Sequence, residues 1–137
     1  MSTPLPRILL VEPQFVLRRT IAMVARDLGV VDFHEASNVG RARSLLAGEA
    51  YAGVVLDLAE GAQATELLAE IRQGKFATRL DAPVIVLAAD GKSVEATRLQ
   101  AVGATGVLGK PVRISDLLST LVDAIKQGSA SLQLLSN

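Results

Sequence analysis

Three ionisable residues each stand at the end of a short apolar run. Asp57 closes the run GVVL, Glu12 follows ILLV, and Lys110 follows TGVLG. A carboxylate at the end of a buried strand costs free energy unless it is hydrated, paired or bound to a metal ion. Lys110 is the natural partner of Asp57. Two interpretations of this pair remain open, a functional site and an ion pair that only tethers two loops.

Apolar runs of strand length alternate with amphipathic stretches along the chain. The runs cover residues 7–11, 30–36, 53–58, 83–89 and 105–109. The first, third and fourth are almost continuously apolar, which is typical of strands buried on both faces of a parallel sheet. Helical patterns lie between the runs, and the clearest one extends from Ile114 to Ile125. The sequence therefore predicts an α/β fold of five βα units, with helices on both sides of an open parallel sheet.

In a sheet of this kind, ligands bind outside the C-terminal ends of the strands. The residues predicted at those ends are Glu12, Asp57, Ala88, Ala89 and Lys110. We therefore expect the three ionisable residues to lie at the same edge of the sheet.

Length and composition limit the classes of protein to which this chain can belong. The 137 residues suit one domain, predicted over 5–127, with 128–137 as a flexible tail or the start of a linker. Acidic and basic residues balance at 14 each, which argues against nucleic acid or an anionic membrane as a partner. The absence of cysteine excludes disulfides and thiolate sites. Because neither a signal peptide nor a membrane span is recognisable, we expect a cytoplasmic protein.

Other common sites fit the sequence poorly. The segment GATGVLGKP (103–111) resembles a phosphate loop, but five residues rather than four separate its outer glycines, and Pro111 replaces the hydroxyl residue that would hold magnesium. His34 is the only histidine, so zinc clusters and Ser-His-Asp catalysis are poorly supported. We expect His34 to be half-exposed on an edge strand. The solvated face of the first helix is expected to carry Arg18, Arg19 and Arg26.

Five segments together resemble the receiver domain of two-component response regulators. They are ILLVE, VVLDL, ELLAEIR, PVIVLAA and GATGVLGKP, and they occur in the right order and at the right spacings. The likeness covers roughly residues 7–127. It implies the flavodoxin-like (βα)5 fold of the chemotaxis regulators, a three-layer sandwich with strand order 2-1-3-4-5.

The resemblance implies roles for individual residues. Asp57 matches the aspartate that accepts a phosphoryl group from a histidine kinase or a histidine phosphotransfer protein. Lys110 matches the lysine that contacts this group, and it is followed by Pro111, as in the family, where the Lys–Pro bond is often cis. The ligands of Mg²⁺ would be Glu12, Asp57 and the backbone carbonyl of Ala59.

The sequence departs from the family at three positions. Pro13 replaces the second acid of the pair that follows the first strand, so we expect a weakened Mg²⁺ site. Ala88 lacks the hydroxyl of the usual Thr or Ser, and Val107 is smaller than the usual Tyr or Phe. The usual Thr/Tyr switch is therefore not expected. The loop after the phosphoacceptor, AEGAQAT (59–65), is about one residue shorter than in the family.

Three functions are compatible with this sequence. The first two are not enzymatic. The first is an atypical receiver domain that is phosphorylated at Asp57. The second is a pseudo-receiver that never carries phosphate and acts as a protein–protein adaptor. In both, the expected surface for a downstream partner is the helix 94–102, the strand 105–109 and the helix that begins at Ile114. The third is a small enzyme or flavin carrier, but the chain lacks the hydroxyl- and aromatic-rich loops that FMN sites usually need.

Overall fold

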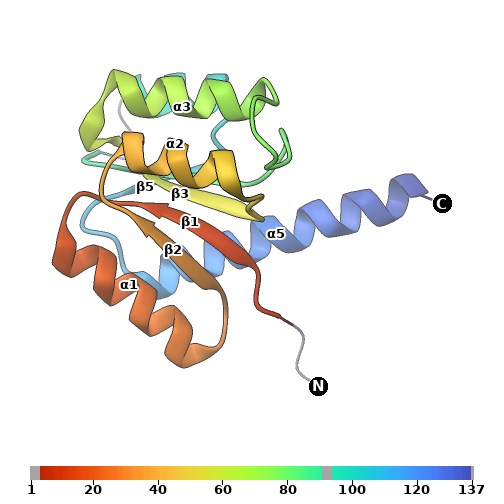
Figure 1. Cartoon of the computed structure of the whole chain (residues 1–137), viewed down its shortest axis with the longest axis horizontal. Helices are drawn as coiled ribbons and strands as arrows, with labels where there is room; N and C mark the ends of the chain where they lie inside the picture. The colour runs from red at the N-terminus through yellow and green to blue at the C-terminus, as the bar shows by residue number, and fades with distance from the viewer. Residues whose placement is uncertain (1–3, 91–93, 137) are drawn as a thin grey trace.

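A parallel sheet of five strands forms the middle layer of the molecule (Figure 1). The structure is a computed structural model that describes residues 4–90 and 94–136. The strand order β2-β1-β3-β4-β5 confirms the predicted α/β, flavodoxin-like topology. The strands are β1 (Arg7–Val11), β2 (Asp32–Ala36), β3 (Gly53–Asp57), β4 (Val84–Ala88) and β5 (Gly106–Gly109).

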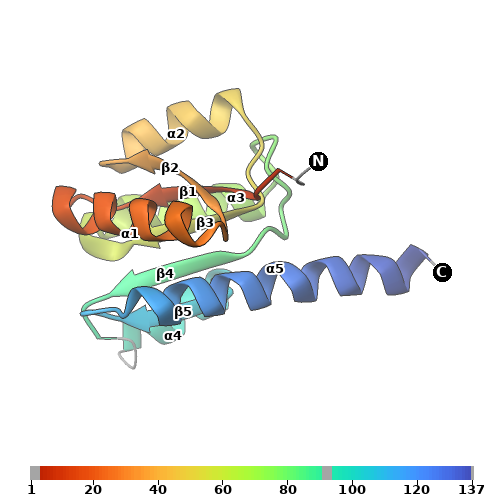
Figure 2. The ribbon, with the colours of Figure 1, turned by 90° about the horizontal axis from the view of Figure 1, so that it is seen from below.

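Helices cover both faces of this sheet. In Figures 1 and 2, α1 and α5 lie on one side, and α2 and α3 lie on the other. The α-helices are α1 (Phe15–Leu28), α2 (Val39–Gly48), α3 (Ala62–Arg72), α4 (Val94–Val102) and α5 (Ile114–Ser136), and a short 3₁₀ helix, η1, spans Leu58–Glu60.

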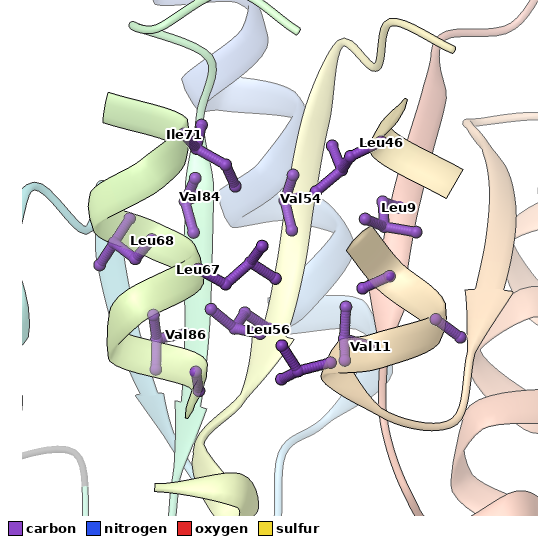
Figure 3. Packing of buried hydrophobic residues seen from close by; sticks show 14 of the residues in the cluster. Leu9, Val11, Leu46, Val54, Leu56, Leu67, Leu68, Ile71, Val84 and Val86 are labelled. Atoms are coloured by element: carbon purple, nitrogen blue, oxygen red, sulfur yellow. The ribbon is translucent and has the colours of Figure 1, made fainter. Parts of the chain in front are cut away.

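The continuous apolar runs are explained by burial on both faces. Because side chains alternate along a strand, Val54 and Leu56 of β3 belong to the core under α2 and α3, whereas Val55 belongs to the core under α1 and α5. Figure 3 shows the first of these cores, where Leu67 of α3 and Leu46 of α2 lie over the strands. Every residue of β3 and β4 is buried. A polar side chain within either strand would therefore be shielded from water, whichever face of the sheet it pointed to.

The segment 59–65 is more regular than the expected loop. The 3₁₀ helix η1 ends at Glu60, and α3 already begins at Ala62. Gly61 alone separates them, with φ of 58°, a conformation that glycine adopts without steric cost. Asp57 therefore leads almost directly into helical structure.

Residues 128–136, expected to form a flexible tail or the start of a linker, continue α5 without a break. Asn137 lies outside the described residues. Gly128 begins this segment, but an interior glycine costs only about 1 kcal/mol and no proline follows it, so the helix can continue. Figures 1 and 2 both show the end of α5 extending beyond the sheet. Among the helices of the described chain, none has the length and hydropathy that crossing a bilayer requires.

Candidate functional site

The C-terminal ends of β1, β3 and β5 bring Glu12, Asp57 and Lys110 together. Val11 is paired with Leu56 across the β1–β3 ladder, so the two acids that follow are neighbours. The backbone N–H of Glu12 extends the ladder to β2 by donating to the carbonyl of Ala36 (3.0 Å). On the other side, the N–H of Lys110 donates to the carbonyl of Ala88 (2.8 Å), beyond the last pair of the β4–β5 ladder. The sheet itself therefore positions all three side chains.

Lys110 forms ion pairs with both acids. Its Nζ atom lies 3.0 Å from Oε2 and 3.3 Å from Oε1 of Glu12, and it contacts Oδ2 of Asp57. The two carboxylates are almost completely buried, and the lysine side chain is 24% exposed. One ammonium therefore neutralises part of the charge of two buried acids, and it can still be reached from solvent.

Asp57 lies at the wall of an open hollow. Its Oδ1 atom accepts a hydrogen bond from the backbone N–H of Ala59 (2.6 Å). Its Oδ2 atom is buried and, among the described residues, has the Lys110 contact but no aligned hydrogen bond. The hollow has a volume of about 400 Å³, and small residues such as Ala59, Gly61 and Ala88 line it beside Asp57. Space for an added group is therefore present next to this carboxylate.

Burial and neighbouring charge shift the proton affinities in the site. Burial raises the pKa of Glu12, the adjacent Asp57 raises it further, and the N–H of Gln14 and the ammonium of Lys110 act in the opposite direction. Burial alone would lower the pKa of Lys110, but its contacts with Asp57 and Glu12 outweigh burial, and the pKa is raised. Lys110 is therefore firmly cationic at neutral pH.

Buried acids at the ends of β1 and β3, joined by a lysine after β5, are the arrangement that the receiver resemblance implied. Residues 8–122 match the response regulator receiver domain family. The chain belongs to this family. It is a receiver domain of two-component signalling, with a CheY-like fold. The cis peptide bond between Lys110 and Pro111 agrees with the expectation for the family.

Solved receiver structures share the fold of this receiver domain. A receiver domain from Francisella is 22% identical, with a TM-score of 0.78, and the match covers 90% of this chain and 98% of the other. A CheY-like protein from Methanospirillum hungatei is 20% identical, with a TM-score of 0.81 and coverage of 93% and 98%. A Burkholderia pseudomallei response regulator, solved with a phosphorylated aspartic acid and a calcium ion, is 22% identical, with a TM-score of 0.74 and coverage of 96% and 75%. No curated protein sequence matches the chain significantly.

The acidic residues beside the hollow bear on the expected weakening of the Mg²⁺ site, which stays a prediction. Glu12 and Asp57 both converge on the ammonium of Lys110, so both could also face a metal ion. Pro13 follows Glu12 on the exposed side of the turn and adds no ligand atom from its side chain. In the described part of the chain, no three His, Cys, Asp or Glu residues are grouped so that they could hold a metal ion. Two carboxylates fall short of the oxygen-rich shell that Mg²⁺ prefers, and the carbonyl of Ala59 remains a predicted third ligand.

The two switch positions hold small apolar side chains. Ala88 is 4% exposed and lines the hollow beside Asp57. Val107 in β5 is partly buried and packs against the core under α2 and α3. Ala88 has no hydroxyl that could bond a phosphoryl group, and Val107 is smaller than the aromatic side chain that the resemblance implied. The absence of the usual Thr/Tyr switch stays a prediction.

Sequence analysis missed two contributors to the site, Arg18 and Gln14. Arg18 was assigned to the solvated face of the first helix, but its side chain is only 13% exposed, and it donates to the carbonyl of Glu12 (2.9 Å). Gln14 donates its backbone N–H to Oε1 of Glu12 (3.0 Å). A backbone contact of this kind leaves no signal in the residue type. Arg18 could have been suspected only from Glu35, an acid in the neighbouring strand β2.

Proposed function

We propose that this receiver domain accepts a phosphoryl group on Asp57, with a weakened Mg²⁺ site and without the Thr/Tyr switch. One observation carries the proposal. The buried carboxylate of Asp57 is in contact with the ammonium of Lys110 at the wall of an open hollow. A nucleophile, a cation to neutralise negative charge, and space for the incoming group are thus adjacent.

The chemistry is a simple displacement. A carboxylate oxygen of Asp57 attacks phosphorus, a new O–P bond forms, and the P–N bond to the histidine of the donor breaks. The imidazole leaves with the electron pair of that bond and takes a proton from water. Lys110, which itself lines the hollow, would stabilise the charge on the phosphoryl oxygens.

Glu12 and Asp57 would hold Mg²⁺, which when bound supplies further neutralisation of phosphoryl charge. Because Pro13 provides no carboxylate, we expect saturation only at higher Mg²⁺ concentration than a site with three acids would need. The expected phosphodonor is a histidine kinase or a histidine phosphotransfer protein. Downstream, we propose a protein partner on the surface of α4, β5 and α5, a cytoplasmic location, and no enzymatic turnover of an external substrate.

The second candidate function is a phosphate-independent interaction module. It is favoured by the contacts of Asp57, because both of its carboxylate oxygens already have a partner, Ala59 for one and Lys110 for the other. In this alternative, the Asp57–Lys110–Glu12 network only stabilises the fold.

Intact mass measurement separates these two functions. The protein is incubated with acetyl phosphate and Mg²⁺, and wild type is compared with Asp57→Asn. A phosphate adduct in the wild type alone supports phosphorylation at Asp57. An adduct of equal yield in both proteins would place the modification elsewhere, and no adduct on folded wild type would favour the interaction module.

A further inference from the structure

The turn between β1 and α1 is held by the backbone of Glu12 as well as by its carboxylate. Its N–H donates to Ala36, its Oε1 accepts from the N–H of Gln14, and its carboxylate meets Lys110. Gln14 is the N-cap residue of α1, but its side chain forms no capping hydrogen bond. The carboxylate of Glu12 can therefore reach Lys110 only while the backbone of this turn keeps its position.

Arg18 connects this turn to the neighbouring strand. One nitrogen of its guanidinium, Nη1, donates to the carbonyl of Glu12 (2.9 Å), and another, Nε, donates to Oε1 of Glu35 in β2 (3.2 Å). The guanidinium thus binds one residue just after β1 and one residue within β2. A planar group with several donors suits this bridge, whereas a single ammonium presents its donors from one nitrogen atom.

The surroundings shield this bridge from solvent. The ring of Phe15 lies 5.5 Å from the guanidinium carbon of Arg18, in the geometry of a cation–π contact. Glu35 is also held by Arg19, whose side chain is 46% exposed. Two arginines therefore share one acid, but only Arg18 also binds the backbone of Glu12.

We propose that Arg18 is a positioning residue for the site, because it holds the backbone of Glu12 so that the Glu12 carboxylate meets Lys110 beside Asp57. Arg18 itself touches neither Asp57 nor Lys110 in the described contacts. Its effect on the turn stands on the geometry alone, whereas its effect on phosphorylation rests on the proposed function. The competing role is a purely structural one, in which Arg18 only fastens α1 to β2 through Glu35.

Hydrogen exchange of the Gln14 backbone amide tests the positioning role directly, because this N–H is bonded to the Glu12 carboxylate. We expect Arg18→Ala to accelerate its exchange roughly tenfold or more, as loss of a charge-assisted hydrogen bond implies. Arg19→Ala is the matched control, since it removes the other arginine on Glu35 and should change Gln14 exchange less than about twofold. Exchange of the Leu56 amide in the core serves as a reference for global destabilisation.

Arg18→Lys separates geometry from charge. We expect Gln14 exchange in this variant to stay close to that of Arg18→Ala, because one ammonium cannot bridge Glu12 and Glu35 as the guanidinium does. Wild-type exchange in Arg18→Lys would overturn the proposal, since charge alone would then suffice. Equal acceleration in Arg18→Ala and Arg19→Ala would overturn it as well, and would favour the structural role.

The rate of acetyl phosphate labelling provides the second measurement. We expect Arg18→Ala to label at least about fivefold more slowly than wild type, and Arg19→Ala to label at the wild-type rate. If wild type takes up no phosphate, the proposed function fails, but Gln14 exchange still decides whether Arg18 positions the turn. Accelerated exchange together with an unchanged labelling rate would overturn the functional part of this inference.

Discussion

The Nζ atom of Lys110 lies 3.0 Å from Oε2 of Glu12, although 98 positions separate the two residues in the sequence. This contact joins the turn after the first strand to the turn after the last. With Asp57 between them in the sheet order, one ion network spans β1, β3 and β5. The network is part of the fold as well as the core of the candidate site, so its contribution to stability can be tested apart from any phosphorylation.

Replacement of Lys110 by methionine should destabilise the protein. The change leaves two buried carboxylates without their cation, and we expect the free energy of unfolding to fall by about 3 kcal/mol. Urea denaturation at neutral pH measures this loss. Lys126→Met, at an exposed position of α5, is the control and should change stability by less than about 0.5 kcal/mol. Adding Glu12→Gln to Lys110→Met should recover part of the lost free energy of unfolding. No recovery would mean that the buried charge of Glu12 does not cause the destabilisation.

Pro13→Asp should strengthen Mg²⁺ binding. A carboxylate at this position adds a third acid beside Glu12 and Asp57, and we expect the dissociation constant to fall about tenfold or more. The shift of the melting temperature with Mg²⁺ concentration reports this change. Val16→Asp places the same charge on a nearby exposed position of α1 and controls for general attraction of cations. If both variants bind Mg²⁺ equally well, position 13 does not face the metal site.

Arg72 and Gly103 should show strong energetic coupling. Arg72 donates to the carbonyls of Gly103, Leu80 and Ala82, at 2.9, 2.8 and 2.7 Å. Gly103 has φ of 122°, and a Cβ atom there would lie 2.9 Å from Nε of Arg72. We expect Gly103→Ala to cost about 2 kcal/mol in the wild type and measurably less in Arg72→Ala, where only the backbone strain remains.

The control for this cycle is Gly48→Ala, at the end of α2. A Cβ atom at Gly48 meets nothing within 4 Å, and its φ is not positive. Its effect should be neutral or slightly stabilising. Strictly additive costs for Gly103→Ala and Arg72→Ala would contradict the predicted contact.

Tyr51 should make stability depend on pH in the alkaline range. Its side chain is buried, and its hydroxyl lies 3.1 Å from Nδ1 of His34. Burial and then the nearby Glu49 raise the pKa of Tyr51 above its ordinary value of 10.0. The folded state therefore holds the phenol proton more tightly than the unfolded state. The stabilising contribution is fully present below pH 10.0 and is lost as pH rises through the higher folded pKa.

Tyrosinate absorbance measures this shift without ambiguity, since Tyr51 is the only tyrosine and the chain has no tryptophan. We expect a midpoint above pH 10 in the folded protein and near 10 in denaturant. In Tyr51→Phe, the decrease of stability above pH 10 should be smaller than in the wild type. An unshifted midpoint in the folded protein would show that the phenol is more hydrated than its burial implies.

Much of the fold could be predicted because its signals are local. The apolar runs predicted strands at 7–11, 53–58 and 83–89, and the strands end within one residue of those bounds. The end of α5 could not be predicted in this way. Gly128 and the serines beside it favour a helix end weakly, and the small cost of one glycine does not decide where a helix stops.

The site was predictable to the extent that it depends on strand ends. Asp57 and Lys110 stood out because an ionisable residue that follows a buried strand is conspicuous, and Pro13 stood out because the receiver resemblance placed an acid there. The contacts of Arg18 were not accessible from the sequence. Its partners are a backbone carbonyl and an acid of another strand, and helical spacing alone assigned it to solvent.

The sequence by itself determined the order of the elements, the receiver family, and the absence of a third acid and of both switch side chains. Only the tertiary structure decided that Lys110 contacts Glu12 as well as Asp57, and that Arg18 binds the backbone of the turn that contains Glu12. The physical reason is that residue type and local periodicity act over a few positions, whereas these contacts depend on strand order and register. Those are properties of the whole sheet, and they bring together side chains that no local pattern relates.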